Sequence, residues 1–138
     1  MIGHFGLATA LALTIAGAAY AEGCAPEGGE AIGEIEAMNA MVLANDFAGY
    51  AAAINGYIGV DVAASIDQVA QVFTDGFDGC STIVQRVDTG GMVQSVVVYH
   101  GKVGPLFGYW QSYSKDGDFA MLTFNLNTDL NAVMASLH

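Results

Sequence analysis

The sequence predicts an α+β fold, with N-terminal helices packed on a curved, four-stranded antiparallel sheet. Three observations predict it. Apolar residues recur at helical spacing as far as residue 74. After Gly79 they recur at every second residue, and pairs of turn residues separate the segments of the second half. Helices followed by a run of strands are typical of helices laid on one face of a sheet.

Residues 1–21 have the pattern of a secretory signal peptide. An apolar run over residues 5–18 ends in the tripeptide AYA, which places small residues at both positions that a signal peptidase reads, although no Lys or Arg precedes it. The run is shorter than the about 20 apolar residues of a membrane anchor. We therefore expect a periplasmic or secreted protein without stable membrane anchoring after cleavage, with one α+β domain over residues 22–138.

Two cysteines, Cys24 and Cys80, remain after this cleavage. In an exported protein such a pair usually forms one disulfide, and closing so long a loop is worth about 4 kcal/mol in chain-entropy terms. Neither a CxxC pair nor histidine-rich spacing accompanies them, which argues against a metal or redox site. Lipidation of Cys24 is the alternative, but the charged Glu22 stands where lipoprotein signals carry small neutral residues.

The chain is strongly acidic. Its formal net charge is −11, and no Lys or Arg precedes Arg86, whereas ten acidic residues lie between Glu22 and Asp78. Such a field repels nucleic acid and anionic membranes, so we expect neither as a partner. A docking face for a cationic partner or for divalent ions is one interpretation. A solvated surface that keeps the protein in solution is the favoured one.

Three helices are expected in the first half, over residues 30–42, 47–54 and 65–74. Asp46 is the expected N-cap of the second helix, and Asn55-Gly56 its end. Ser65 and Gln68 have the spacing of a capping box at the start of the third helix.

Four strands are expected in the second half, over residues 80–89, 92–100, 105–114 and 118–126. Gly90-Gly91 and Asp116-Gly117 are strong two-residue hairpin signals. Successive hairpins imply a meander, and a last helical turn over residues 130–137 is expected to follow a cap at residues 127–129. His138 is expected to fray.

Strict alternation assigns the strand residues to faces. In the third strand Gly108 shares a face with Leu106, Trp110 and Ser112, and a glycine inside a strand often marks a bend. A sheet curved there around the helices would make a cone, and a cone can hold an apolar pocket. The other face of this strand carries Phe107, Tyr109, Gln111 and Tyr113. In the fourth strand the face expected in the core is Ala120, Leu122, Phe124 and Leu126.

The order of elements over residues 30–126 resembles the nuclear-transport-factor-like or ketosteroid-isomerase-like superfamily of cystatin-like α+β cones, in a small secreted bacterial form. Two short segments contribute to this resemblance, LANDF at residues 43–47 and FNLNT at residues 124–128. The resemblance implies a cone and a group that includes isomerases, dehydratases and binding domains. The paired tyrosine and aspartates of the isomerases have no counterpart by position, so no catalytic residue is carried over.

Few residues are candidates for chemistry. His100, beside Tyr99 at the end of the second strand, is the candidate general base at a pocket mouth, against the simpler interpretation of a turn residue. Asp75, Asp78 and the pair Asp116/Asp118 lack the spacing of a calcium loop, so no metal site is expected. Motifs for phosphate or dinucleotide binding are missing, so no cofactor is expected. The aromatic candidates for ligand stacking are Phe107, Tyr109, Trp110 and Tyr113.

Three functional hypotheses follow. The leading one is non-catalytic binding of a small apolar ligand or a protein partner, through the concave side or the open edge of the sheet. The second is an isomerase- or lyase-type enzyme with a pocket His or Asp as the base, so enzymatic activity stays open. The third is a self-associating structural protein, a homodimer through the sheet face. It requires an uncovered apolar patch made of Phe107, Tyr109, Tyr113, Phe119 and Met121.

Overall fold

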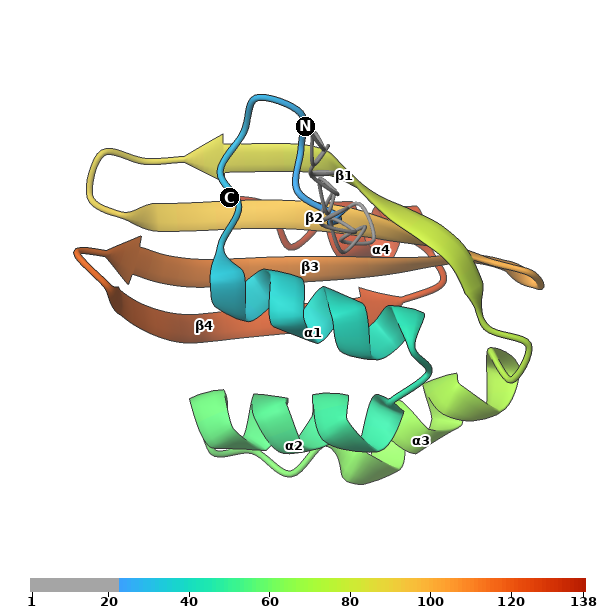
Figure 1. The fold of residues 1–138 in the computed structure, drawn as a ribbon. Helices are drawn as coiled ribbons and strands as arrows, with labels where there is room; N and C mark the ends of the chain where they lie inside the picture. The colour runs from blue at the N-terminus through green and yellow to red at the C-terminus, as the bar shows by residue number, and fades with distance from the viewer. Residues whose placement is uncertain (1–22) are drawn as a thin grey trace, which may run out of the picture.

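The computed structural model describes residues 23–138, and the α+β prediction is confirmed there (Figure 1). The predicted signal peptide and its cleavage point lie outside the described residues. The helices are α1 (Gly33–Leu43), α2 (Phe47–Ile58), α3 (Ala63–Val72) and α4 (Leu130–Met134). The strands are β1 (Phe77–Val87), β2 (Met92–Gly101), β3 (Gly104–Lys115) and β4 (Asp118–Asn127).

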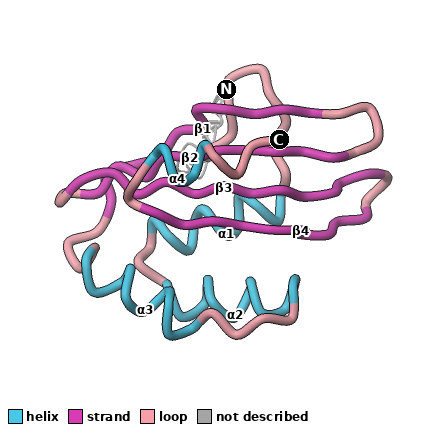
Figure 2. Tube along the Cα trace, turned by 180° about the vertical axis from the view of Figure 1, so that it is seen from behind, coloured by secondary structure: helices cyan, strands magenta, loops and turns pink. Residues whose placement is uncertain are grey.

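The four strands form one antiparallel meander in the order β1-β2-β3-β4. The helices α1, α2 and α3 lie on one side of this sheet, which we call the inner face, and α4 lies on the other, the outer face (Figures 1 and 2). This arrangement is compatible with a cone-like fold. No helix among residues 23–138 is long and apolar enough to cross a membrane.

All four helices differ from the sequence prediction at one or both ends, and α2 and α3 show the local reason. The third helix begins at Ala63 rather than at residue 65, because the Asp61 side chain accepts a hydrogen bond from the Ala63 N–H (3.0 Å) and Ser65 caps nothing. The capping-box prediction is therefore wrong. The second helix passes through Asn55-Gly56 and ends at Ile58. Its C-cap, Gly59, adopts the left-handed conformation (φ 70°) and donates its N–H to the Asn55 carbonyl.

The predicted N-cap of the second helix is confirmed. Asp46 accepts a hydrogen bond from the Gly49 N–H at 2.9 Å. The last helix is likewise capped by Asp129, which accepts from the Asn131 N–H.

Three register shifts break the strict alternation of side chains that was assumed for the strands, one in β4 and two in β1. In β4 the register shifts opposite Gln111 and Ser112, so that Leu122 is an extra residue. A bulge of this kind exchanges the faces of all residues on one side of it. The prediction that Ala120 and Leu122 share the core face with Phe124 is therefore wrong: both are exposed, Leu122 by 50%.

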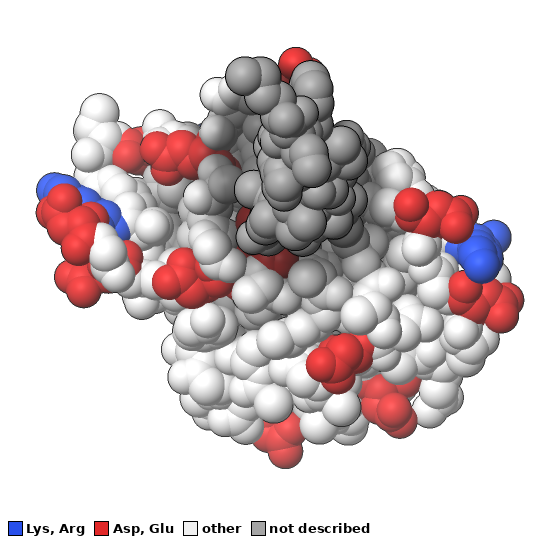
Figure 3. Space-filling view, viewed as in Figure 1, with Lys and Arg blue, Asp and Glu red and all other residues white. Residues whose placement is uncertain are grey.

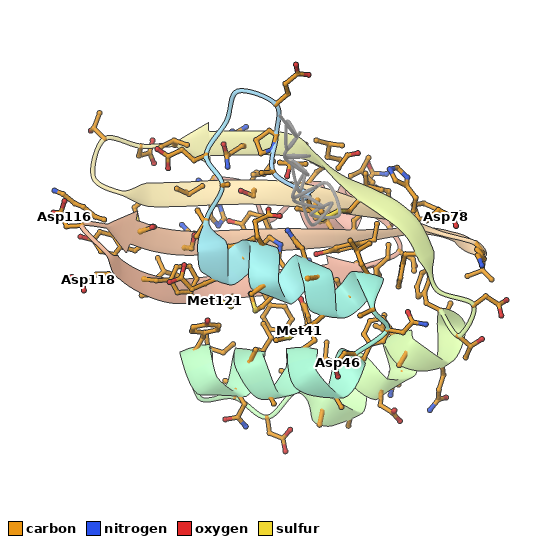
Figure 4. All side chains as sticks on the ribbon, in the orientation of Figure 1. Met41, Asp46, Asp78, Asp116, Asp118 and Met121 are labelled. Atoms are coloured by element: carbon orange, nitrogen blue, oxygen red, sulfur yellow. A yellow bond between two sulfur atoms is a disulfide. The ribbon has the colours of Figure 1, made fainter. Side chains whose placement is uncertain are left out.

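Met121 takes the place predicted for Leu122. It is buried, and Figure 4 shows it between the sheet and the helices. Phe119 is partly buried against the same core, as is Phe124 beyond the bulge. The two shifts in β1 lie between Phe77 and Cys80 and between Thr82 and Val84.

The segment that precedes α1 is tied to β1 by a disulfide and three hydrogen bonds. Cys24 and Cys80 form the predicted disulfide, with their Cα atoms 5.2 Å apart. The Thr82 hydroxyl donates to the Cys24 carbonyl. The Gln85 amide accepts from the Glu30 N–H (2.9 Å) and donates to the Glu30 carbonyl (2.8 Å). Disulfides persist in oxidising compartments, so this bond indicates such a location.

The outer face is covered by α4 and the residues that follow it. Val133 of α4 packs on a buried apolar cluster of β2 and β3. His138, expected to fray, is held at the surface of the sheet: its carbonyl accepts from Arg86 (3.1 Å) and Gln94 (3.3 Å), and its N–H donates to Gln94 (3.1 Å). The fraying prediction is wrong because those two strand side chains supply partners. The cluster under Val133 consists of Val96, Val98, Phe107 and Tyr109.

Gly108 should be intolerant of any side chain. A Cβ atom there would lie 3.3 Å from Cε2 and 3.4 Å from the hydroxyl of Tyr99, which is fully buried. We expect Gly108→Ala to lower the free energy of unfolding by about 1–3 kcal/mol through overpacking. Denaturant titration measures the loss. Gly56→Ala is the control, because a Cβ there meets open space inside a helix, and it should stabilise by about 0.5–1 kcal/mol. Equal effects at the two glycines would contradict the argument.

Candidate functional site

The inner core contains a hydrogen bond between the sheet and α1. The hydroxyl of Tyr99, on β2, donates to Oδ1 of Asn39, on α1. Both residues are buried, with exposed fractions of 0% and 1%. A polar pair this deep is stable only because each partner satisfies the other.

The same network reaches the disulfide-bonded segment through Glu36. One carboxylate oxygen of Glu36 accepts from the Asn39 amide (3.3 Å), and the other accepts from the Cys24 N–H (2.9 Å). Glu36 and Asn39 lie on one helix face because they are three residues apart. The chain of contacts therefore runs from Cys24 through α1 to the middle of the sheet.

Two further polar groups in this core have no hydrogen-bond partner within the part of the chain that the structure describes. They are the Tyr50 hydroxyl and the Trp110 Nε1–H. The two rings lie against each other, with centroids 5.7 Å apart. An unsatisfied buried donor costs about 1–3 kcal/mol, so these groups lower the stability of the fold.

Burial controls the ionisation of these tyrosines. Burial raises the pKa of Tyr99 far above its usual range, and the negative charge of Glu36 raises it further. The Trp110 side chain lowers this pKa in part. Burial, with the neighbouring Tyr99, also raises the pKa of Tyr50. Both hydroxyls therefore stay protonated at neutral pH, and neither acts as a base; the Tyr99 hydroxyl donates to Asn39.

The structure separates the two candidates for general-base chemistry. Tyr99 points into the core, whereas His100, the next residue, is exposed on the β2–β3 hairpin opposite Pro105. Neighbouring residues on a strand point to opposite faces. The two side chains therefore do not meet at one pocket mouth.

The four aromatic candidates for ligand stacking are divided between the two faces of the sheet. Trp110 is buried in the inner core. Phe107 and Tyr109 are buried on the outer face beneath α4, and Tyr113 is partly exposed farther along the strand. These residues do not line one pocket together. The patch required for a sheet-face homodimer is likewise divided, because Met121 faces the helices.

The acidic candidates are also dispersed. Asp78 lies at one end of the sheet and the pair Asp116/Asp118 at the other (Figure 4). Among residues 23–138 no cluster of three or more potential ligands could hold a metal ion.

An open groove of about 530 Å³ lies between α2 and α3. Its floor consists of Phe47, Ala51 and Ile66, which are all buried. Its rim is exposed and consists of small or polar residues: Ala48, Ala52, Asn55, Asp61, Ala63, Ala64 and Asp67. The groove forms because alanines on the facing sides of the two helices leave space that longer side chains would fill.

A second hollow, of about 300 Å³, lies on the other side of α3, toward the ends of β3 and β4. Phe73, Leu106 and Leu126 supply apolar wall, and its polar residues are uncharged: Ser65, Gln68, Asn127 and Thr128. Only Ile66 of α3 is fully buried. This helix therefore lies between two hollows.

The sequence analysis did not identify Asn39, Glu36 or the α2–α3 groove. A pocket was expected between the sheet and the helices. Aromatic and aliphatic side chains fill this space at the middle of the inner face. A sequence signal for the groove did exist, since residues 47–64 contain six alanines in two helices. No family model, curated protein or solved structure matches this chain. Its function has to be inferred from these sites.

The two buried tyrosines should respond in opposite ways to loss of their hydroxyl groups. Tyr99→Phe leaves Asn39 Oδ1 buried without its donor, and we expect a loss of about 1–3 kcal/mol in the free energy of unfolding. Tyr50→Phe removes an unsatisfied group and should be neutral or stabilising. Urea titration of both variants measures this difference. A Tyr50→Phe variant as unstable as Tyr99→Phe would mean that the Tyr50 hydroxyl has a partner.

Stability should fall in alkaline solution. The folded state holds the tyrosine protons because burial raises the pKa of Tyr50 and Tyr99, whereas the unfolded chain releases them near pH 10. Above about pH 10 the free energy of unfolding should therefore drop by up to about 1.4 kcal/mol per pH unit for each tyrosine. Denaturant titrations from pH 8 to 11 measure the slope, which should be shallower in each Tyr→Phe variant. Identical slopes would contradict the prediction.

Proposed function

We propose that this protein is an exported, disulfide-stapled binding domain that holds a small molecule with an apolar body in the α2–α3 groove. The observation that carries the proposal is the apolar floor of Phe47, Ala51 and Ile66 in a groove of about 530 Å³. Ligand pockets usually have volumes of about 300–1,000 Å³ and are predominantly apolar, with a few polar groups. The groove has this size and composition.

Binding is favoured over catalysis because titratable groups do not converge on the floor of the groove. The two carboxylates that line it, Asp61 and Asp67, are on the exposed rim. A general acid or base would need a perturbed pKa and a fixed place beside the reacting atoms. The buried hydroxyls of Tyr50 and Tyr99 belong to the core and contact no solvent.

We also infer that the fold belongs to the nuclear-transport-factor-like and ketosteroid-isomerase-like cones. Three helices followed by an antiparallel meander, with these helices on one side of the sheet, support this. The disulfide and the signal-like sequence of residues 1–21 support export to the periplasm or beyond.

Filling the groove should abolish ligand binding. We propose Ala52→Trp, because Ala52 lies on the exposed rim and a large ring there occupies the groove without entering the core. The probe is N-phenyl-1-naphthylamine, a neutral apolar dye whose fluorescence rises on transfer from water. Wild-type protein should enhance the fluorescence with saturation, and Ala52→Trp should bind the dye at least about tenfold more weakly.

The matched control is Ala40→Trp, an equally large change at an exposed position on α1, outside the groove. It should bind the dye as the wild type does. Failure of the wild-type protein to bind, or equal losses in the two variants, would overturn the assignment to the groove.

A further inference from the structure

We propose that the ligand of the α2–α3 groove carries a positive charge beside its apolar body, as an alkylamine does. This inference rests on the proposed function and adds the chemical class of the ligand. It follows from the place of two carboxylates on the rim and from the distribution of charge over the whole helical layer.

Asp61 and Asp67 line the same groove, at the start of α3 and within it. Each uses one carboxylate oxygen for a neutral donor: Asp61 accepts from the Ala63 N–H (3.0 Å), and Asp67 accepts from the Gln71 amide (3.2 Å). Neither donor cancels the negative charge. Both side chains are exposed, so a cationic group above the apolar floor can reach them.

The wider field has the same sign. All three Lys and Arg residues of the chain follow residue 85. Every charged side chain of the helices α1 to α3 is therefore acidic. Figure 3 shows acidic residues over the helical layer, with Lys and Arg confined on this face to the two ends of the sheet. A groove in such a field attracts cations and repels anions.

The second hollow provides an internal comparison. It lies on the other side of α3 and has apolar walls, but its polar residues carry no charge. Charge is therefore a property that distinguishes the α2–α3 groove from the neighbouring hollow. Of the two hollows beside α3, the α2–α3 groove is the one that offers a cationic amphiphile both an apolar floor and counter-ions.

The test displaces N-phenyl-1-naphthylamine from the wild-type protein with three ligands that share an eight-carbon chain. At pH 7 octylamine is a cation, octanol is neutral and octanoate is an anion. Octylamine should displace the dye at about fivefold lower concentration than octanol, as two exposed carboxylates allow, and octanoate should be the weakest. The preference should disappear in 1 M salt, where the screening length falls to about 3 Å.

Paired variants locate the charge effect. Asp61→Asn with Asp67→Asn should bring octylamine to the level of octanol, while the amide oxygen of Asp61→Asn can still accept the hydrogen bond from the Ala63 N–H. Asp116→Asn with Asp118→Asn removes the same net charge from the far hairpin (Figure 4) and should preserve the preference.

The outcomes separate this inference from the function on which it rests. If octanol binds in the groove, is blocked by Ala52→Trp and competes as well as octylamine, the charge inference fails and the proposed function stands. If both asparagine pairs weaken octylamine equally, the net field rather than the rim is responsible, and the inference fails. If no ligand is blocked by Ala52→Trp, the proposed function itself fails.

Discussion

The hydrogen bond between Tyr99 and Asn39 is the constraint on which the arrangement of this molecule depends. It fixes the distance between α1 and the middle of the sheet, because neither partner can lose the other without leaving a polar atom buried. Gly108 belongs to the same constraint, since a Cβ there would lie in tight contact with the Tyr99 ring, 3.3 Å from Cε2. Through Glu36 the bond is continuous with the Cys24–Cys80 region, so the disulfide and the buried network hold the same segment.

This network explains why the centre of the inner face is core rather than pocket. Tyr50 and Trp110 pack against each other there, and their polar atoms are buried without partners among residues 23–138. The space that a more open cone would leave for a ligand is occupied by side chains. The two larger hollows lie instead beside α3, which buries only Ile66. The candidate binding site therefore lies at the surface of the helical layer, beside the weakly buried helix α3, and not on the side of the sheet where a cone would hold its ligand.

The fold places part of the acidic charge of the chain at the α2–α3 groove. As a property of the sequence, a net charge of −11 concerns solubility and the repulsion of polyanions. The fold places two of these charges, Asp61 and Asp67, around an apolar floor and all the lysine and arginine residues elsewhere. The same carboxylates also accept hydrogen bonds from Ala63 and Gln71 of α3. A structural role and a ligand-recognition role are therefore compatible at these two positions.

The sequence by itself determined the α+β class, the order of the strands, the caps at Asp46 and Asp129 and the single disulfide. These features depend on local periodicity, on turn chemistry and on the count of cysteines, which are all readable along the chain. Tertiary structure decided the rest. The bulge at Leu122 changed which residues of β4 face the core, because one extra residue reverses the alternation that sequence analysis must assume. The partners of Tyr99 and the groove between α2 and α3 arise from residues distant in sequence. No local pattern encodes the distance between two helices or the donor that a buried hydroxyl will meet.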